Sequence, residues 1–399
     1  MSEATTTRPE SAPAAQEPRR RRAWVDQVVL YLLSFLLALV ISGVLIAFAN
    51  PEVRDAAKYF FSQPMDTISA AWDAVWDAYR ALFSGAIINF RTDTFAQAIR
   101  PFTESLYNAT PLILAGLAVA LAFRAGLFNI GAQGQLIIGA LLSAYVGFKW
   151  VLPPGIHIVL AIVVGIIGGA IWGGIAGLLK AGTGAHEVIA TIMLNWIAIY
   201  LLQFALTQDA FQRTGRDDPI SPAVKLAARL PRILGQDYRI NLGFLLALGA
   251  AFLVWWLLER STIGFEFRAV GANPNAARTA GINVRRSLTL VMVFAGGLAG
   301  LAGVTQVLGG ATEYALGNGI AGDVGFDAIT VALLGKSRPG GVVAAGILMG
   351  ALRAGGSAMQ AATSTPIDIV LVVQSLIVLF LAAPPLVRSI FRLRAPVPA

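Results

Sequence analysis

Ten apolar runs follow one another along this chain of 399 residues and leave it few possible folds. Hydrophobic residues make up 56% of the chain and charged residues only 13%, whereas soluble domains carry roughly a quarter charged residues. Because a membrane-spanning helix needs roughly 20 apolar residues, we predict an all-α polytopic integral membrane protein with about eight to ten transmembrane helices. The runs span residues 27–49, 110–123, 135–148, 156–179, 188–206, 242–258, 288–308, 326–334, 342–354 and 367–383. The run 326–334 is too short to cross a bilayer, so we expect a half-helix or re-entrant segment there.

The cations that give the net charge of +8 lie in short patches beside the apolar runs. The positive-inside rule explains this arrangement, so we expect no nucleic-acid partner. The rule places Arg19 to Arg22, the loop 259–286 and the C-terminal arginines in the cytosol, together with both chain ends. We expect a disordered cytosolic tail over 1–23, which is rich in Pro, Ala, Thr and Glu, a transmembrane domain over 24–390 and a cytosolic tail over 391–399. The loop 207–239 would be external although it also carries basic residues.

The chain offers little chemistry for an enzyme or a metal site. It has no cysteine and only two histidines, which excludes disulfides, thiolate ligands and an imidazole cluster. Gly335-Lys336-Ser337 is similar to the end of a phosphate-binding loop, but Thr330 stands where that pattern requires glycine. We therefore expect no catalytic residue, no metal, no cofactor and no ATP site in this chain.

Glycines and amide side chains interrupt the apolar pattern between Phe123 and Gln135. Backbone that leaves helical geometry inside a membrane must be buried in protein or line a water-filled cavity. We therefore predict that Asn129, Gln133 and Gln135 face the protein interior at a helix break. Two roles stay open for these amides and for the adjacent Phe128. They line the path of a polar solute, or they belong to an ordinary turn and satisfy helix ends.

Glu187, Thr191 and Asn195 recur every four residues and therefore share one face of a predicted helix. Polar groups within a span favour a functional hypothesis, which adds Thr191 and Asn195 to the candidates for the solute path. The structural alternative is a carboxylate that complements a helix dipole and an amide that joins two helices. For Glu187 we favour the structural role.

The loop 259–286 contains a predicted short cytosolic helix. Asn273 suits the N-cap, Pro274 suits the first helical position, and Gly281 suits the position just past the end. Because spans flank the loop on both sides, a partner that moves this helix would move the membrane helices. Small residues such as Ala277 are expected to form a close docking surface. A passive connector is the alternative, but a connector needs neither a defined helix nor this length.

Two further patterns concern packing. Glycine at every fourth position from Gly165 to Gly177 predicts the close approach of another helix, and the pairs 296/300 and 346/350 repeat the device. Aromatic residues recur at helical spacing between Ile68 and Phe83, with charged residues between them. That segment is predicted to be a helix that lies at the membrane interface or packs on the rest of the protein.

Residues 111–135, 187–195 and 264–282 closely resemble the permeases of bacterial ABC importers for branched-chain amino acids, ribose and nucleosides. The nucleoside or simple sugar branch is the nearest, and stretches 326–335 and 351–360 extend the resemblance over most of the chain after about residue 105. The resemblance implies that the predicted cytosolic helix is a coupling helix that docks on an ATPase. It assigns this coupling to Gly271, Asn273, Pro274, Ala276, Ala277, Arg278 and Gly281. One departure is Gln133, where the family more usually has glutamate.

The resemblance also implies the partners of this chain. They are a cytosolic ABC ATPase that holds ATP and magnesium, a second related permease and an extracytoplasmic solute-binding lipoprotein. Membrane lipid is a further expected partner of the spans. We expect import of nucleosides across the bacterial plasma membrane by alternating access, with ribose or another simple sugar as the alternative solute. A proton-coupled secondary transporter that uses Glu187 is an alternative from another class, and it would need no docking helix. A purely structural subunit would leave the amides and the loop unexplained.

Overall fold

The computed structural model describes residues 17–215, 218–363 and 366–392, and over these residues it is helical, with isolated β-bridges but no strand. The predicted all-α fold is therefore confirmed. The chain divides into two compact units, residues 1–75 with 371–399 and residues 76–370. The larger unit contains every residue that is discussed below as a candidate for function.

The smaller unit contains three complete helices and parts of two more. Its complete helices are α1 (Glu17–Ala49), α2 (Pro51–Ala57) and α15 (Pro384–Ile390), while α3 (Pro64–Ala86) and α14 (Ile367–Ala382) cross into the larger unit. Because α1 begins at Glu17, the expectation of disorder up to residue 23 is wrong for residues 17–23. Arginine is a good helix former, so this segment continues the helix of the first apolar run. Residues 1–16 and 393–399 of the two expected tails lie outside the described residues.

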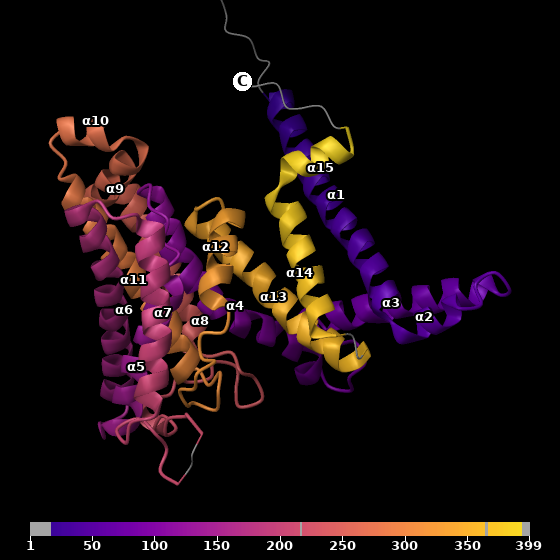
Figure 1. The fold of residues 1–399 in the computed structure, drawn as a ribbon, viewed down its shortest axis with the longest axis horizontal. Helices are drawn as coiled ribbons and strands as arrows, with labels where there is room; N and C mark the ends of the chain where they lie inside the picture. Colours follow the sequence, from indigo (N-terminus) through magenta and orange to yellow (C-terminus); the bar gives the residue numbers. More distant parts are fainter. Residues whose placement is uncertain (1–16, 216–217, 364–365, 393–399) are drawn as a thin grey trace, which may run out of the picture. The chain divides into compact units, whose positions relative to one another are not determined.

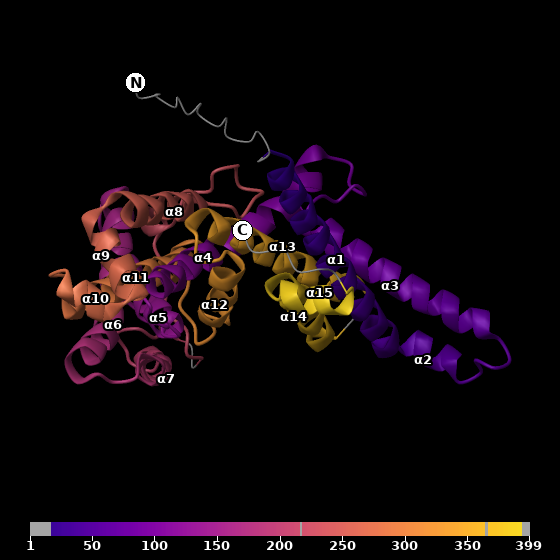
Figure 2. The ribbon, with the colours of Figure 1, turned by 90° about the horizontal axis from the view of Figure 1, so that it is seen from above.

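The larger unit is a bundle of helices whose connections lie at its two ends (Figures 1 and 2). Figure 1 shows α9 and α10 at one end of the bundle and the loop 207–241 at the opposite end. The elements are α4 (Phe95–Arg124), α5 (Ala132–Lys149), α6 (Ile156–Thr183), α7 (Glu187–Leu206), α8 (Leu242–Arg260), α9 (Thr262–Ala272), α10 (Pro274–Thr279), α11 (Val284–Leu308), α12 (Val324–Leu334), α13 (Pro339–Thr363) and a 3₁₀ turn at Leu226–Ala228.

Seven of the described helices are long and apolar enough to cross a membrane, namely α1, α4, α6, α7, α8, α11 and α13. All ten predicted runs lie in helices, but three of those helices, α5, α12 and α14, are short or carry buried amides. The predicted half-helix is α12, whose 11 residues extend about 16 Å at 1.5 Å per residue and cannot cross the hydrocarbon layer alone.

The glycines of α6 pack against the glycines of α11, as their spacing predicts. A Cβ atom on Gly169 would overlap the carbonyl oxygen of Gly296 and lie 2.6 Å from Cα of Gly300. A Cβ atom on Gly173 would also meet Gly296. These helices therefore approach backbone to backbone, which only residues without a side chain allow.

Helix α3 confirms that the segment 68–83 is helical and combines both environments considered for it. Ile68, Trp72 and Trp76 are exposed, whereas Ala78 and Leu82 are buried. One face therefore packs on protein, and its exposed aromatic face suits a membrane interface.

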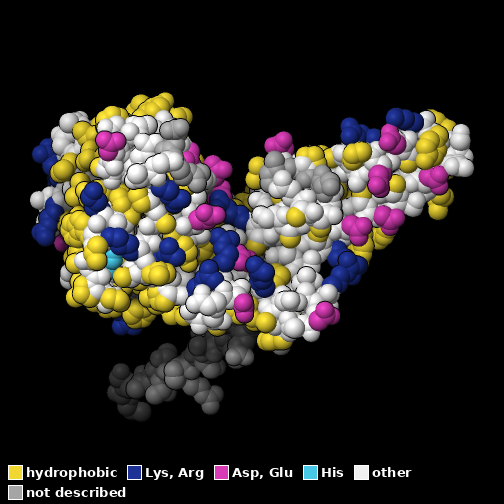
Figure 3. Space-filling view, turned by 90° about the horizontal axis from the view of Figure 1, so that it is seen from below, with side chains coloured by type: hydrophobic (Ala, Val, Ile, Leu, Met, Phe, Trp, Pro, Cys, Tyr) yellow, Lys and Arg dark blue, Asp and Glu magenta, His cyan; other side chains and the backbone are white. Residues whose placement is uncertain are grey.

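The loop 207–241 folds back on the end of the bundle. The backbone N–H of Ser221 donates to the carbonyl oxygen of Leu316 at 2.9 Å, and Lys225 Nζ donates to the carbonyl oxygen of Trp150 at 3.0 Å. Figure 3 views this end of the molecule and shows basic side chains among the hydrophobic ones. This loop contains the basic residues Lys225, Arg229 and Arg232. The positive-inside rule alone therefore does not identify this end as external.

Candidate functional site

The chain leaves helical geometry between α4 and α5, in a turn whose amide side chains are buried inside the larger unit, whereas Gly126 and Phe128 are exposed. Asn129, Gln133 and Gln135 are 0%, 5% and 1% exposed, which confirms that all three face the interior. The side-chain amides of Asn129 and Gln135 exchange two hydrogen bonds of 3.0 Å each. This pairing closes the turn because each amide satisfies a donor and an acceptor of the other.

Gln133 connects the turn to the start of half-helix α12. Its Nε2 donates to the carbonyl oxygen of Gly322 at 2.6 Å, and its Oε1 accepts from the backbone N–H of Gly325 at 2.8 Å. The first N–H groups of a helix have no partner within the helix, so Gln133 supplies one for α12. A glutamate here would accept from Gly325 but, when ionised, would not donate to Gly322.

Helix α7 holds the other side of the turn through Asn195. The Oδ1 of Asn195 accepts from the backbone N–H of Gly134 at 2.8 Å, and its Nδ2 donates to the carbonyl oxygen of Ile130 at 2.9 Å. Thr191 is also buried and its hydroxyl donates to the carbonyl of Glu187 at 2.8 Å. The residues predicted from the sequence are thus brought together by the fold, and their amides satisfy helix ends.

Phe128 and Glu187 have more exposed surroundings than these amides. Phe128 is 56% exposed and its ring lies edge-on to Phe123, with 5.2 Å between the ring centroids. Glu187 forms an ion pair of 2.7 Å with Lys180 at the end of α6. That ion pair supports the structural role of Glu187, because the carboxylate joins the two ends of a helix connection.

A second cluster of polar groups surrounds a cavity of about 30 Å³ between α4, α8, α11 and α13, which we call the polar chamber. Tyr107 and Asn241 are 8% and 4% exposed, and the Tyr107 hydroxyl has no hydrogen-bond partner among the described residues. The residues that line the polar chamber include Tyr107, Asn108, Thr110, Asn241, Gln306 and Arg353.

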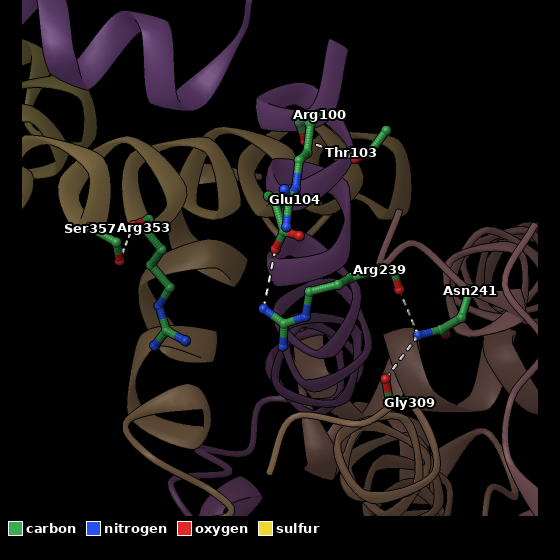
Figure 4. Close-up of polar contacts among 8 residues, drawn as sticks. All are labelled: Arg100, Thr103, Glu104, Arg239, Asn241, Gly309, Arg353 and Ser357. Atoms are coloured by element: carbon green, nitrogen blue, oxygen red, sulfur yellow. Dashed lines mark hydrogen bonds and ion pairs between the residues drawn. The ribbon is translucent and has the colours of Figure 1, made fainter. Parts of the chain in front are cut away.

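Two ion pairs flank the polar chamber. Arg239 Nη1 lies 3.2 Å from Glu104 Oε2, with its guanidinium 4.2 Å above the ring centroid of Tyr107. Arg353 Nη2 lies 2.6 Å from Asp327 Oδ2, so the chamber is linked to half-helix α12. Figure 4 shows Arg239 directed at Glu104, and Asn241 between the carbonyl groups of Arg239 and Gly309.

The sequence patterns did not single out this chamber. Asp327 and Arg353 are charges within apolar runs, which is a signal for a functional hypothesis. Tyr107 and Gln306 carry no such signal, because single polar residues in separate helices reveal nothing about their neighbours.

The connection between α8 and α11 contains the predicted short helix as α10, preceded by α9. Asn273 Oδ1 accepts from the N–H groups of Asn275 and Ala276 at 3.0 and 3.1 Å, and Pro274 is the first helical residue. Gly281 follows the helix with φ of 84°, a value that favours glycine. The predicted start, end and capping of this helix are confirmed.

The expected docking surface is wrong in one residue. Ala277 is 4% exposed and packs with Val270 and Val284, so its side chain holds α10 onto α9 and α11. The exposed face of α10 instead presents Ala276 and Arg278. The sequence pattern could not separate these faces, because α10 has only 6 residues and nearly all are small or polar.

Helix α9 contacts the turn between α4 and α5 through glycine. A Cβ atom on Gly271 would overlap the carbonyl oxygen of Arg124 and lie 2.8 Å from the carbonyl carbon of Ala125. Gly126, with φ of 74°, faces Gly271 from the other side. Arg124 extends this contact, since its Nε donates to the carbonyl oxygen of Ser337 at 3.2 Å. The α9–α10 pair is therefore packed directly against the start of the buried turn.

Comparison with known proteins finds related transport proteins. Residues 102–382 match the family described as branched-chain amino acid transport system / permease component. A guanosine ABC transporter permease protein of Bacillus subtilis is 39% identical over 72% of this chain and 82% of its own length. A nucleoside ABC transporter permease protein of Lactococcus lactis is 35% identical over 73% of this chain and 82% of its own.

Sugar permeases also match. A glucose ABC transporter permease protein of Haloferax volcanii is 33% identical over 76% of this chain and 80% of its own length. No solved structure matches the chain. The family match covers most of the larger unit and all of α14, including the turn between α4 and α5, the polar chamber and α10. The chain therefore belongs to the family of branched-chain amino acid transport system permease components and is a multi-pass permease subunit of an ABC importer.

Proposed function

We propose that this permease imports nucleosides across the bacterial plasma membrane, driven by ATP hydrolysis on a separate subunit. The two relatives that are 39% and 35% identical, whose names state guanosine and nucleoside transport, support this choice of solute. The chain supplies the membrane path, and Asn129, Gln133, Gln135, Thr191 and Asn195 remain our candidates for residues beside that path, with Phe128 at its edge.

The proposal requires partners. A cytosolic ABC ATPase would bind ATP and magnesium, a second related permease would form the other wall of the path, and an extracytoplasmic lipoprotein would deliver the solute. Family membership supports an assembly of this general kind. Charge supports the proposed cytosolic position of α9 and α10, because five arginines lie in or next to them, namely Arg260, Arg268, Arg278, Arg285 and Arg286.

The contact between Gly271 and the turn 125–131 is the observation that carries the coupling mechanism. Because α10 is fixed to α9 and α11 by Ala277, a partner that pushes α10 would displace α9 as well. Gly271 has backbone against it at Arg124 and Ala125, so that displacement would reach the buried turn without a compliant side chain between them. The start of α5, which follows the turn, holds α7 through Asn195 and α12 through Gln133.

A sugar is the second candidate solute. The glucose permease relative, 33% identical, supports it. A proton-coupled secondary transporter is less well supported, because Glu187 is already paired with Lys180 at 2.7 Å.

The test uses the complete transporter in lipid vesicles, with solute-stimulated ATP hydrolysis and nucleoside uptake measured together. Gly281→Pro would force φ near −65° at a residue that has φ of 84°, so we expect insertion to persist while uptake per ATP falls. Gly235→Pro is the matched control, because Gly235 also has a positive φ, of 99°, but lies in the loop at the opposite end. Wild-type uptake by Gly281→Pro, or uptake by the permease without any ATPase, would overturn the proposal.

A further inference from the structure

The polar chamber contains polar groups that the described part of the chain does not satisfy. The Tyr107 hydroxyl is buried with no hydrogen-bond partner among the described residues, although the guanidinium of Arg239 lies over its ring. The half-buried side-chain amides of Asn108 and Gln306 also make no hydrogen bond with the described residues. Pro111 adds an acceptor, because it has no N–H to donate to the carbonyl oxygen of Tyr107 one helical turn earlier. Buried polar groups are almost always paired, and unpaired groups inside a membrane protein are especially costly. A ligand that both donates and accepts hydrogen bonds would satisfy this cluster.

Charge and size narrow the class of ligand. The cationic groups beside the chamber are already neutralised, Arg353 by Asp327 and Arg239 by Glu104, so an anion would gain little there. The remaining groups suit a neutral partner. A space of about 30 Å³ admits a water molecule or a hydroxyl group but not a planar base.

We propose that the polar chamber recognises a hydroxyl group on the sugar ring of the transported solute, with Tyr107 and Gln306 as the groups that read it. This inference rests on the proposed function and names the part of the solute that this chain recognises. A hydroxyl group donates to the amide oxygen of Gln306 or the carbonyl of Tyr107 and accepts from the phenol of Tyr107. The same chemistry serves a nucleoside and a free sugar, which fits relatives named for both kinds of solute.

The experiment compares variants that remove one polar group each. Tyr107→Phe deletes a single oxygen atom and Gln306→Leu replaces an amide by an apolar side chain of similar size. Tyr200→Phe and Gln203→Leu are matched controls, because both residues lie on exposed positions of α7 away from the chamber. Each variant is assembled into the complete transporter in vesicles. Uptake is measured for a ribonucleoside, its 2′-, 3′- and 5′-deoxy analogues, the free nucleobase and ribose.

Losing one hydrogen bond of ordinary strength should reduce uptake of the parent nucleoside about fivefold. Uptake of the one analogue that already lacks the recognised hydroxyl should stay unchanged. Because the same lipoprotein delivers each solute to every variant, the ratio of variant to wild-type uptake isolates the permease step. A similar loss for ribose but not for the nucleobase would place recognition on the sugar.

Equal changes for the parent and all three analogues would overturn the inference, as would wild-type uptake in Tyr107→Phe. If the wild-type transporter takes up ribose but no nucleoside, the proposed function fails, and deoxyribose analogues then test the chamber by the same ratio. If the wild type takes up neither solute, both proposals fail. Should Gln306→Leu not insert, Tyr107→Phe alone decides the outcome.

Discussion

Replacing Gly271 with alanine adds one methyl group at the contact between α9 and the buried turn, and we expect this change to uncouple ATP hydrolysis from transport. The added Cβ would overlap the carbonyl oxygen of Arg124 and lie 2.8 and 2.9 Å from the carbonyl carbon and Cα of Ala125. All three atoms belong to the backbone, so no change of rotamer relieves the overlap. Either α9 or the turn must move.

The size of the effect follows from these distances. Carbon atoms pack best at 3.5 to 4.0 Å, so the methyl group is too close to Ala125 by roughly 0.6 Å. Overfilling a packed site of this kind costs about 1 to 3 kcal/mol. Alanine recovers up to about 1 kcal/mol through its better helix propensity, since Gly271 lies within α9. A net loss of up to about 2 kcal/mol is enough to separate the two elements without preventing insertion of the apolar spans.

The assay measures nucleoside uptake per ATP hydrolysed in vesicles that contain the complete transporter. Gly249→Ala is the matched control, because it makes the same chemical change inside α8, where an added Cβ would have no neighbour within 4 Å. We expect Gly249→Ala to behave as wild type and Gly271→Ala to hydrolyse ATP with reduced uptake. Normal coupling in a well-inserted Gly271→Ala transporter would refute the mechanical link. Equal impairment of the control would show that the assay reports stability instead of coupling.

Three further changes test other parts of the structure. Gln133→Leu should destabilise the permease by about 1 to 3 kcal/mol, because the buried N–H of Gly325 loses its acceptor; thermal unfolding in detergent would show it, and an unchanged midpoint would contradict it. Ala277→Trp should loosen α10 by overfilling a buried site, and proteolysis of this loop should become faster. Unchanged resistance to proteolysis together with failed ATPase binding would instead support the sequence prediction that Ala277 belongs to the docking surface. Glu187→Gln removes the ion pair with Lys180, and uptake should remain driven by ATP and insensitive to a proton gradient. If a proton gradient drives uptake in the wild type but not in the variant, the secondary-transporter hypothesis would be supported instead.

Features that depend on near neighbours in the chain could be predicted from the amino-acid sequence. Apolar runs predicted the helices of the membrane domain, because a span in lipid must satisfy its backbone polar groups by hydrogen bonds within the helix. The limits of α10 followed from Asn273, Pro274 and Gly281, since caps act within about four residues. The glycine spacing of α6 predicted a close helix contact, and the spacing of α11 independently predicted another.

Which of these features meet in space could not be predicted in the same way. That α6 packs against α11, that Gln133 caps a helix 192 residues further along the chain, and that Ala277 faces inward all depend on packing between distant segments. The polar chamber is the extreme case, because α4, α11 and α13 contribute Tyr107, Gln306 and Arg353. Tyr107 and Gln306 carry no functional signal in their own helices, and the charge of Arg353 does not reveal which residues surround it. Local rules describe the conformation of one segment, whereas a site of this kind arises from the positions of several rigid helices, which only their packed interfaces determine.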